Sequence, residues 1–127
     1  MLDFEEVNVL GQLLDTTWGR SSNAGAPTIS VKGKIQGDKI LLTYTSYATF
    51  ASSMAQSQQL PRFIDEGKQA TALFIKKIRA DFKTETGKTL SMKVLSSTPS
   101  VEIISLQPHV SPRRTVSFRF LTIAELF

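Results

Sequence analysis

The feature that most constrains the fold is a single apolar stripe at helical spacing in the middle of the chain. The stripe repeats at every fourth position and is formed by Ala70, Phe74, Ile78 and Phe82. Lysines and arginines occupy much of the remaining surface of this segment. We therefore expect an amphipathic helix that buries one face, within a helical region over residues 46–83. Because proline is tolerated in the first turn of a helix but not in its interior, Pro61 predicts two helices in this region, and Gly87 predicts the end of the second.

Runs of alternating apolar and polar residues, the pattern of half-buried strands, lie on both sides of the helical region. Residues 29–35 and 40–45 precede it and are joined across Gly37-Asp38, a pair that suits a tight hairpin turn. Three more runs follow it, over residues 90–94, 101–105 and 116–120. The tail, residues 121–127, either extends the last strand or forms a final helical turn.

The strands and the helix together predict an α+β fold. Short loops within each group of strands favour antiparallel pairing, and one amphipathic helix can cover one face of the resulting sheet. The expected architecture is a two-layer sandwich, with an antiparallel sheet of about five strands in the chain order ββ-α-βββ covered by one long helix. The other face of the sheet would carry hydroxyl and cationic side chains with hardly any carboxylates: Ser30, Lys32, Lys34, Thr43, Thr45, Ser91, Lys93, Thr115, Ser117 and Arg119.

A further amphipathic helix is expected near the N-terminus, over about residues 3–15. Asp3 and Glu6 have the spacing of a capping box, in which a carboxylate accepts a free backbone N–H of the first turn. The apolar stripe of this helix is expected to consist of Phe4, Val7, Gly11 and Leu14, with Leu10 beside them.

The segment after this helix, residues 19–27, is small, polar and rich in glycine, which predicts a flexible linker. We therefore divide the chain into an N-terminal arm with its linker, residues 1–27, and a single α+β domain, residues 28–127. A helix on a flexible tether either folds back on its own domain or reaches another subunit, and the length of the tether permits both.

Residue types that carry most catalytic and metal chemistry are scarce. The chain has no Cys and one His, which excludes disulfides, zinc sites built from thiolates and metal sites that need two imidazoles. Gly87-Lys88-Thr89 matches the end of a phosphate-binding loop, but that motif needs a glycine where Phe82 stands, and its helix and strand come in the opposite order. His109 lies between two prolines, and only Ser111 offers a catalytic side chain nearby. We therefore expect no enzymatic activity and no cofactor.

The ends and hydropathy of the chain bear on its location. The first residues, MLDFEE, are acidic where a signal peptide is basic, and the longest aliphatic run is Ile40-Leu41-Leu42. The expected location is therefore the cytoplasm or an assembled viral particle, without secretion through a signal peptide and without a membrane partner.

The net charge of +4 divides unevenly along the chain. Residues 1–27 carry four acidic side chains and one basic side chain, a balance of −3, whereas residues 28–127 have a balance of +7. An acidic arm joined to a basic body is electrostatically suited to dock on another copy of the chain. The expected interface residues are Phe4, Val7, Leu14 and Trp18, with Trp18 as an anchor for a partner's pocket.

The same basic residues allow a second interpretation, contact with nucleic acid. Its candidate residues are Lys76, Lys77 and Arg79 on the helix and Arg113 and Arg114 in a loop. The expected exposed face lacks the aromatic side chains on which sheet proteins stack bases, because Phe118 and Phe120 share a strand face with Val116.

In its general character the chain resembles accessory proteins of tailed-phage particles. It is small, has no Cys and no catalytic constellation, and its expected strands are rich in Ser and Thr. We therefore expect a non-enzymatic structural or assembly protein that acts through contacts with itself or with other structural proteins, such as the components of a tailed-phage particle. The alternative is a nucleic-acid-binding module.

Overall fold

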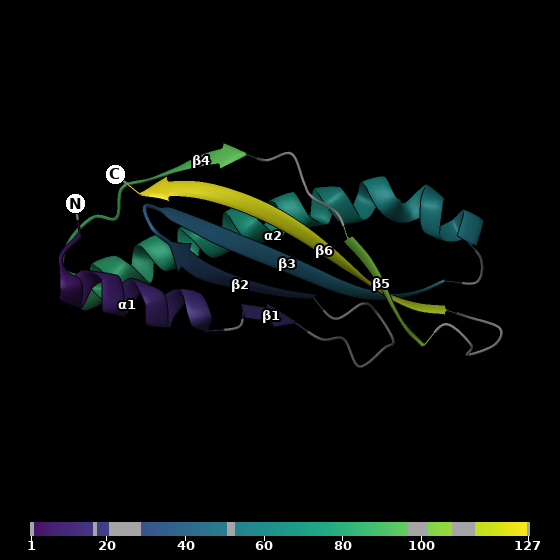
Figure 1. Cartoon of the computed structure of the whole chain (residues 1–127), viewed down its shortest axis with the longest axis horizontal. Coiled ribbons are helices and arrows are strands. Elements are labelled where there is room, and N and C mark those ends of the chain that lie inside the picture. The colour runs from purple at the N-terminus through teal and green to yellow at the C-terminus, as the bar shows by residue number, and fades with distance from the viewer. Residues whose placement is uncertain are drawn as a thin grey trace.

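The protein folds as an α+β two-layer sandwich, as the sequence predicts (Figure 1). The computed structural model describes residues 2–16, 18–20, 29–50, 53–96, 102–107 and 114–126. Along these residues the elements are α1 (Phe4–Asp15), β1 (Trp18–Arg20), β2 (Ile29–Gln36), β3 (Lys39–Phe50), α2 (Ser53–Thr86), β4 (Met92–Ser96), β5 (Glu102–Gln107) and β6 (Arg114–Leu126).

All strand pairs of the sheet are antiparallel. The strand order is β1-β2-β3-β6-β4, and β5 also pairs with β6. The longest pairing joins β3 and β6, which match residue for residue from Lys39 opposite Glu125 to Phe50 opposite Arg114. Strands from both halves of the sequence therefore form one sheet around this central pair.

The long helix α2 lies diagonally across one face of the sheet (Figure 1). Its predicted stripe is confirmed, because Ala70, Phe74, Ile78 and Phe82 are all buried. The sheet contributes side chains that point to the same side: Val31, Ile40, Leu42, Tyr44, Phe120 and Ala124. Burial of one large apolar side chain stabilises a fold by roughly 1.5–3 kcal/mol, so each of these side chains contributes to the stability of the two-layer packing.

Two sequence predictions about α2 are wrong. Residues 46–50 are not helical but continue β3, because the pairing with β6 extends through all twelve positions of that strand. Pro61 does not divide the helix, which runs unbroken from Ser53 to Thr86. Pro61 is exposed, so water can solvate the carbonyl that lacks its N–H partner, and this lowers the cost of an interior proline.

The turn and the end of the chain agree with the sequence pattern. Gly37 has a φ of 66° in the hairpin between β2 and β3, a backbone conformation that residues with a Cβ rarely adopt. Gly87, with a φ of 74°, directly follows the last residue of α2, as predicted. Of the two alternatives for the tail, the structure has the strand, since β6 continues to Leu126.

Helix α1 packs on its own chain, against α2 and β2. The predicted capping box is present, with the Glu6 N–H donating to Asp3 Oδ1 at 2.8 Å and the Asp3 N–H donating to Glu6 Oε1 at 3.4 Å. The predicted apolar stripe is wrong in part, because the buried face consists of Glu6, Leu10 and Leu14. Phe4, by contrast, is 80% exposed.

Two contacts fix the position of α1. Gly33 of β2 makes room for the helix, because a Cβ at this position would lie 2.7 Å from Leu14 Cδ2. At the other end of α1, Lys88 Nζ donates to Glu6 Oε1 at 2.9 Å, so the buried Glu6 carboxylate has a cationic partner. The helix is therefore part of the same hydrophobic core as the sheet and α2.

This packing gives a first prediction. Leu14→Ala should lower the free energy of unfolding by about 2–5 kcal/mol, because it removes a fully buried side chain and leaves a cavity between α1 and β2. Urea denaturation followed by circular dichroism measures the change. Gln12→Ala, on the exposed side of the same helix, is the matched control and should change stability by less than about 0.5 kcal/mol. Equal effects of the two substitutions would contradict the docking of α1.

Candidate binding groove

The face of the sheet opposite α2, called here the open face, is ordered in cross-strand rows. The register places Ser30, Thr45 and Arg119 side by side in one row. The next row is Lys32, Thr43 and Leu121, and the one after it is Lys34, Leu41 and Ile123. Hydroxyl groups and cations therefore border a small apolar patch formed by Leu41, Leu121 and Ile123, and the next row on this face is Gln36, Lys39 and Glu125.

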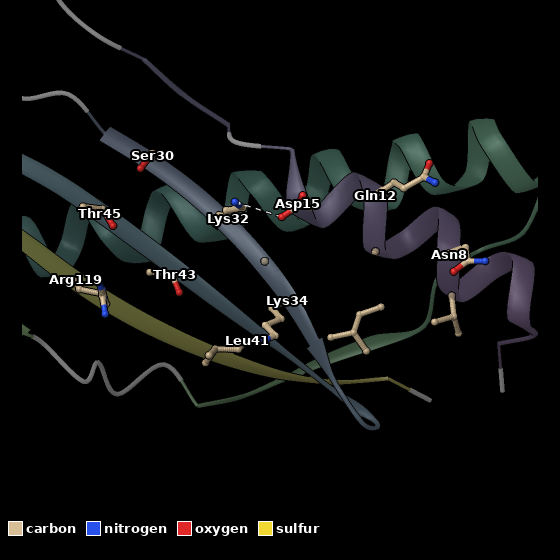
Figure 2. A pocket seen from close by; sticks show the side chains of 14 residues that line it. Asn8, Gln12, Asp15, Ser30, Lys32, Lys34, Leu41, Thr43, Thr45 and Arg119 are labelled. Atoms are coloured by element: carbon tan, nitrogen blue, oxygen red, sulfur yellow. Dashed lines mark ion pairs between the residues drawn. The ribbon is translucent and has the colours of Figure 1, made fainter.

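A groove of about 970 Å³ lies between α1 and the open face. Helix α1 forms one wall, to which it contributes Val7, Asn8, Gly11, Gln12 and Asp15. The sheet forms the floor, with Ser30, Lys32, Gly33, Lys34, Ile35, Leu41, Thr43, Thr45 and Arg119. Figure 2 shows the labelled side chains of β2, β3 and β6 on the side of the sheet away from α2, with α1 beside them.

The groove is cationic. Its lining has three cations, Lys32, Lys34 and Arg119, against the single carboxylate of Asp15. Lys32 Nζ lies 3.3 Å from Asp15 Oδ1, an ion pair that joins the floor to the wall (Figure 2). Both side chains are more than half exposed, so this pair contributes little to stability, about 0–1 kcal/mol. The excess positive charge favours an anionic or acidic occupant.

The groove is also graded in polarity along its length. Its apolar end lies beside the first half of α1 and the β2–β3 hairpin and is formed by Val7, Ile35 and Leu41. Phe4 lies on the same side of α1 as Val7 and Gly11, one turn toward the N-terminus. An occupant that fits this surface therefore has apolar side chains as well as negative charge.

The four residues predicted to form an interface divide into two pairs. Phe4 and Val7 are exposed, by 80% and 37%. Leu14 is fully buried in the core of its own chain, and the ring of Trp18 lies 6.5 Å from that of Phe74. The structure thus leaves Phe4 and Val7 accessible to a partner, whereas Leu14 and Trp18 pack internally.

Two of the residues predicted to contact nucleic acid, Lys77 and Arg79, have partners within the chain. Lys77 Nζ lies 2.6 Å from Asp81 Oδ2, and Arg79 Nη2 donates to the Met92 carbonyl at 2.6 Å. Lys76 is exposed on the same helix. Arg113 lies outside the described residues, and for Arg114 the structure describes only the backbone, in β6.

Of the two motif candidates for catalysis, the structure describes only Gly87-Lys88-Thr89. Gly87, Lys88 and Thr89 connect α2 to β4, and Lys88 is used by the ion pair with Glu6. His109 lies outside the described residues. In the part of the chain that the structure describes, no three His, Cys, Asp or Glu side chains come together as a metal site would require, and neither helix is long and apolar enough to cross a membrane.

Sequence reasoning missed the apolar part of the open face and the wall of the groove. Leu121 and Ile123 were in the tail with two possible structures, and only the register with β3 brings them beside Leu41. Asn8 and Gln12 are ordinary exposed helix residues until α1 docks beside β2. The alternation of residues 116–120 continues to residue 126, and this longer pattern predicts a strand with Leu121 and Ile123 on the same face as Arg119.

Comparisons of this chain with protein-family models, with curated proteins and with solved structures find no match. The functional argument therefore depends on the geometry and chemistry of the groove.

The wall of the groove has a pH-dependent anchor. The backbone N–H of Glu6 donates to the Asp3 carboxylate and lowers its pKa below the ordinary value of 3.8. The hydrogen bond to Glu6 raises the pKa of Lys88 above 10.5. The contribution of Asp3 is therefore present above pH 3.8 and lost as the pH falls through the lower folded-state value, and that of Lys88 is present below pH 10.5 and lost in stronger alkali.

We predict that stability falls in acid partly through Asp3. Wild-type protein should lose more stability below pH 3.8 than Asp3→Asn, because the amide oxygen still caps α1 but does not titrate. Urea denaturation between pH 2 and 6 measures both proteins. An identical acid loss in the two proteins would show that the Asp3 cap does not contribute.

Proposed function

We propose that this protein is a non-enzymatic assembly protein that binds a partner protein through the groove and the open face of its sheet. The observation that carries the proposal is that apolar side chains are exposed on this face among polar and cationic ones. Ile123 is 38% exposed beside Leu41 and Leu121, on the face of the sheet opposite the core that α1 and α2 cover. Exposed apolar side chains inside a polar rim are typical of protein interaction sites.

The hydroxyl-rich floor supports a protein partner. Thr43 and Thr45 lie on β3 in the middle of their rows, and Ser30 lies beside Thr45 on β2. A hydroxyl group costs less to desolvate than a charged group and can exchange its water for a partner's hydrogen bond. Phe4 adds an exposed aromatic ring at the rim, the type of side chain that supplies much of the binding energy in protein interfaces.

The partner we propose is another copy of the chain or another structural protein. An assembled particle such as that of a tailed phage is the setting we favour, and this part of the proposal rests on composition: a small chain without Cys and with Ser- and Thr-rich strands.

A second candidate function, nucleic-acid binding, is favoured by one observation, the excess of three cations over one carboxylate in the groove. The lining contains no aromatic ring for base stacking, which favours a protein partner instead. Binding of a fluorescently labelled poly(dT) strand of about 30 nucleotides, titrated at several salt concentrations, separates the two candidate functions. Phosphate contacts predict a steep fall of affinity with salt, whereas no binding at about 50 mM salt removes this candidate.

Site-specific photo-crosslinking tests the proposed function. The photoreactive residue p-benzoylphenylalanine is placed at Thr43, on the open face, or at Lys76, on the outer side of α2, as the matched control. Both proteins are irradiated in extracts of the cells or particles in which the protein naturally occurs. We expect a protein adduct from position 43 and little or none from position 76.

Mass spectrometry identifies the adduct. An adduct with the chain itself or with a structural protein supports assembly through the open face. No protein adduct at position 43, or equal adducts at both positions, would overturn the proposal.

A further inference from the structure

We infer that the groove takes α1 of a second copy of this chain, in a two-fold dimer where the two α1 helices lie side by side over the two open faces. This inference rests on the proposed function and names the partner. It follows from three properties of the groove and its wall: their charges, their exposed apolar side chains and their dimensions.

The charges of α1 complement those of the open face. Residues 2–16 contain four carboxylates and no cation. Asp3, Glu6 and Asp15 have partners within the chain, while Glu5 is exposed. The floor of the groove carries Lys34, which is exposed and has no ion-pair partner among the described residues. An acidic helix laid over a cationic floor is therefore electrostatically favourable.

Two-fold symmetry makes this arrangement specific. In an isologous contact each surface patch meets the partner's copy of a complementary patch. Direct stacking of one open face on the other would bring two cationic surfaces together, which is unfavourable. With α1 over the floor, each copy instead presents its acidic helix to the other's basic sheet.

The exposed apolar side chains of the two elements match as well. Phe4 and Val7 form the outer apolar part of α1, and Leu41, Leu121 and Ile123 form the apolar patch of the floor. The two-fold axis runs along the helices, so the two α1 helices are parallel and Phe4 of each copy lies at the apolar end of the other's groove. A Cβ at Gly11, near the middle of the helix, would meet nothing within 4 Å. The two helices can therefore approach closely where they cross.

The dimensions are compatible. A helix of 12 residues is about 18 Å long. The three rows from Ser30 to Lys34 span roughly 13 Å along the strands, so one α1 covers all of them. The dimer then covers both the exposed Phe4 and the apolar patch of each copy, leaving Leu73 on α2 exposed.

Analytical ultracentrifugation of the purified full-length chain over about 1–200 μM tests this inference, a range that brackets weak specific dimers. We expect a concentration-dependent dimer that weakens as salt rises, because charge attraction is screened. Phe4→Ser and Ile123→Thr should each raise the dissociation constant at least about tenfold, as loss of an interface anchor does. Leu73→Ser, which alters a 56% exposed side chain on α2, is the matched control and should leave it unchanged. Circular dichroism verifies that each variant is folded.

Several outcomes would overturn the inference. These are a monomer at every concentration, a dimer that ignores both Phe4→Ser and Ile123→Thr, and a dimer broken by Leu73→Ser. If the purified chain is monomeric while position 43 crosslinks to a different protein in the extract, the second copy is wrong as the occupant and the proposed function stands. If position 43 also gives no adduct, both fail.

Discussion

One helix can bury only one face of a sheet, and this constraint governs the molecule. The stripe of α2, centred on Phe74 and Ile78, covers the face that carries Tyr44 and Phe120. Helix α1 packs beside α2 and β2 with Leu10 and Leu14 in the same core, so the opposite face has no helix across it in the part of the chain that the structure describes. The side chains in the open rows are therefore those that water or a partner must cover. Their mixture of hydroxyls, cations and a few aliphatic groups is tolerable in water and suitable for a contact.

Helix α1 connects this constraint to function. Its inner face joins the core through Leu10 and Leu14, and the Glu6–Lys88 pair holds its first turn. The same docking turns Phe4 and Val7 outward, beside the open face. An acidic helix and a basic groove are thus presented together on one side of the molecule, and this arrangement is the physical basis of the proposed assembly.

Local chemistry made part of this structure predictable from the sequence. The Gly37 turn, the Asp3 cap and the Phe74 stripe depend on neighbours within a few residues, so their patterns are legible in the sequence. Features that depend on pairing with residues far away in the sequence could not be predicted in this way. Residues 46–50 join β3 because β6 lies beside them, and Pro61 stays within a helix because its side of α2 faces water.

The candidate site shows the same division. Alternation predicted the hydroxyls and lysines of the open face, but not the aliphatic patch, because Leu121 and Ile123 reach Leu41 only through the β3–β6 register. The helical spacing of Phe4, Val7 and Leu14 suggested one apolar face. In the structure α1 packs against Gly33 with a different side, so that Leu14 lies in the core and Phe4 is exposed.

The central claim is that the open face is covered by a second copy, and hydroxyl-radical footprinting of the purified protein tests it most directly. The reactivity of Leu41, Leu121 and Ile123 is measured by mass spectrometry at low and high protein concentration, with Leu73 as the internal reference. The account predicts that the three open-face side chains become protected at high concentration while Leu73 keeps its reactivity. Unchanged reactivity of the open face across a concentration range in which the protein dimerises would contradict it.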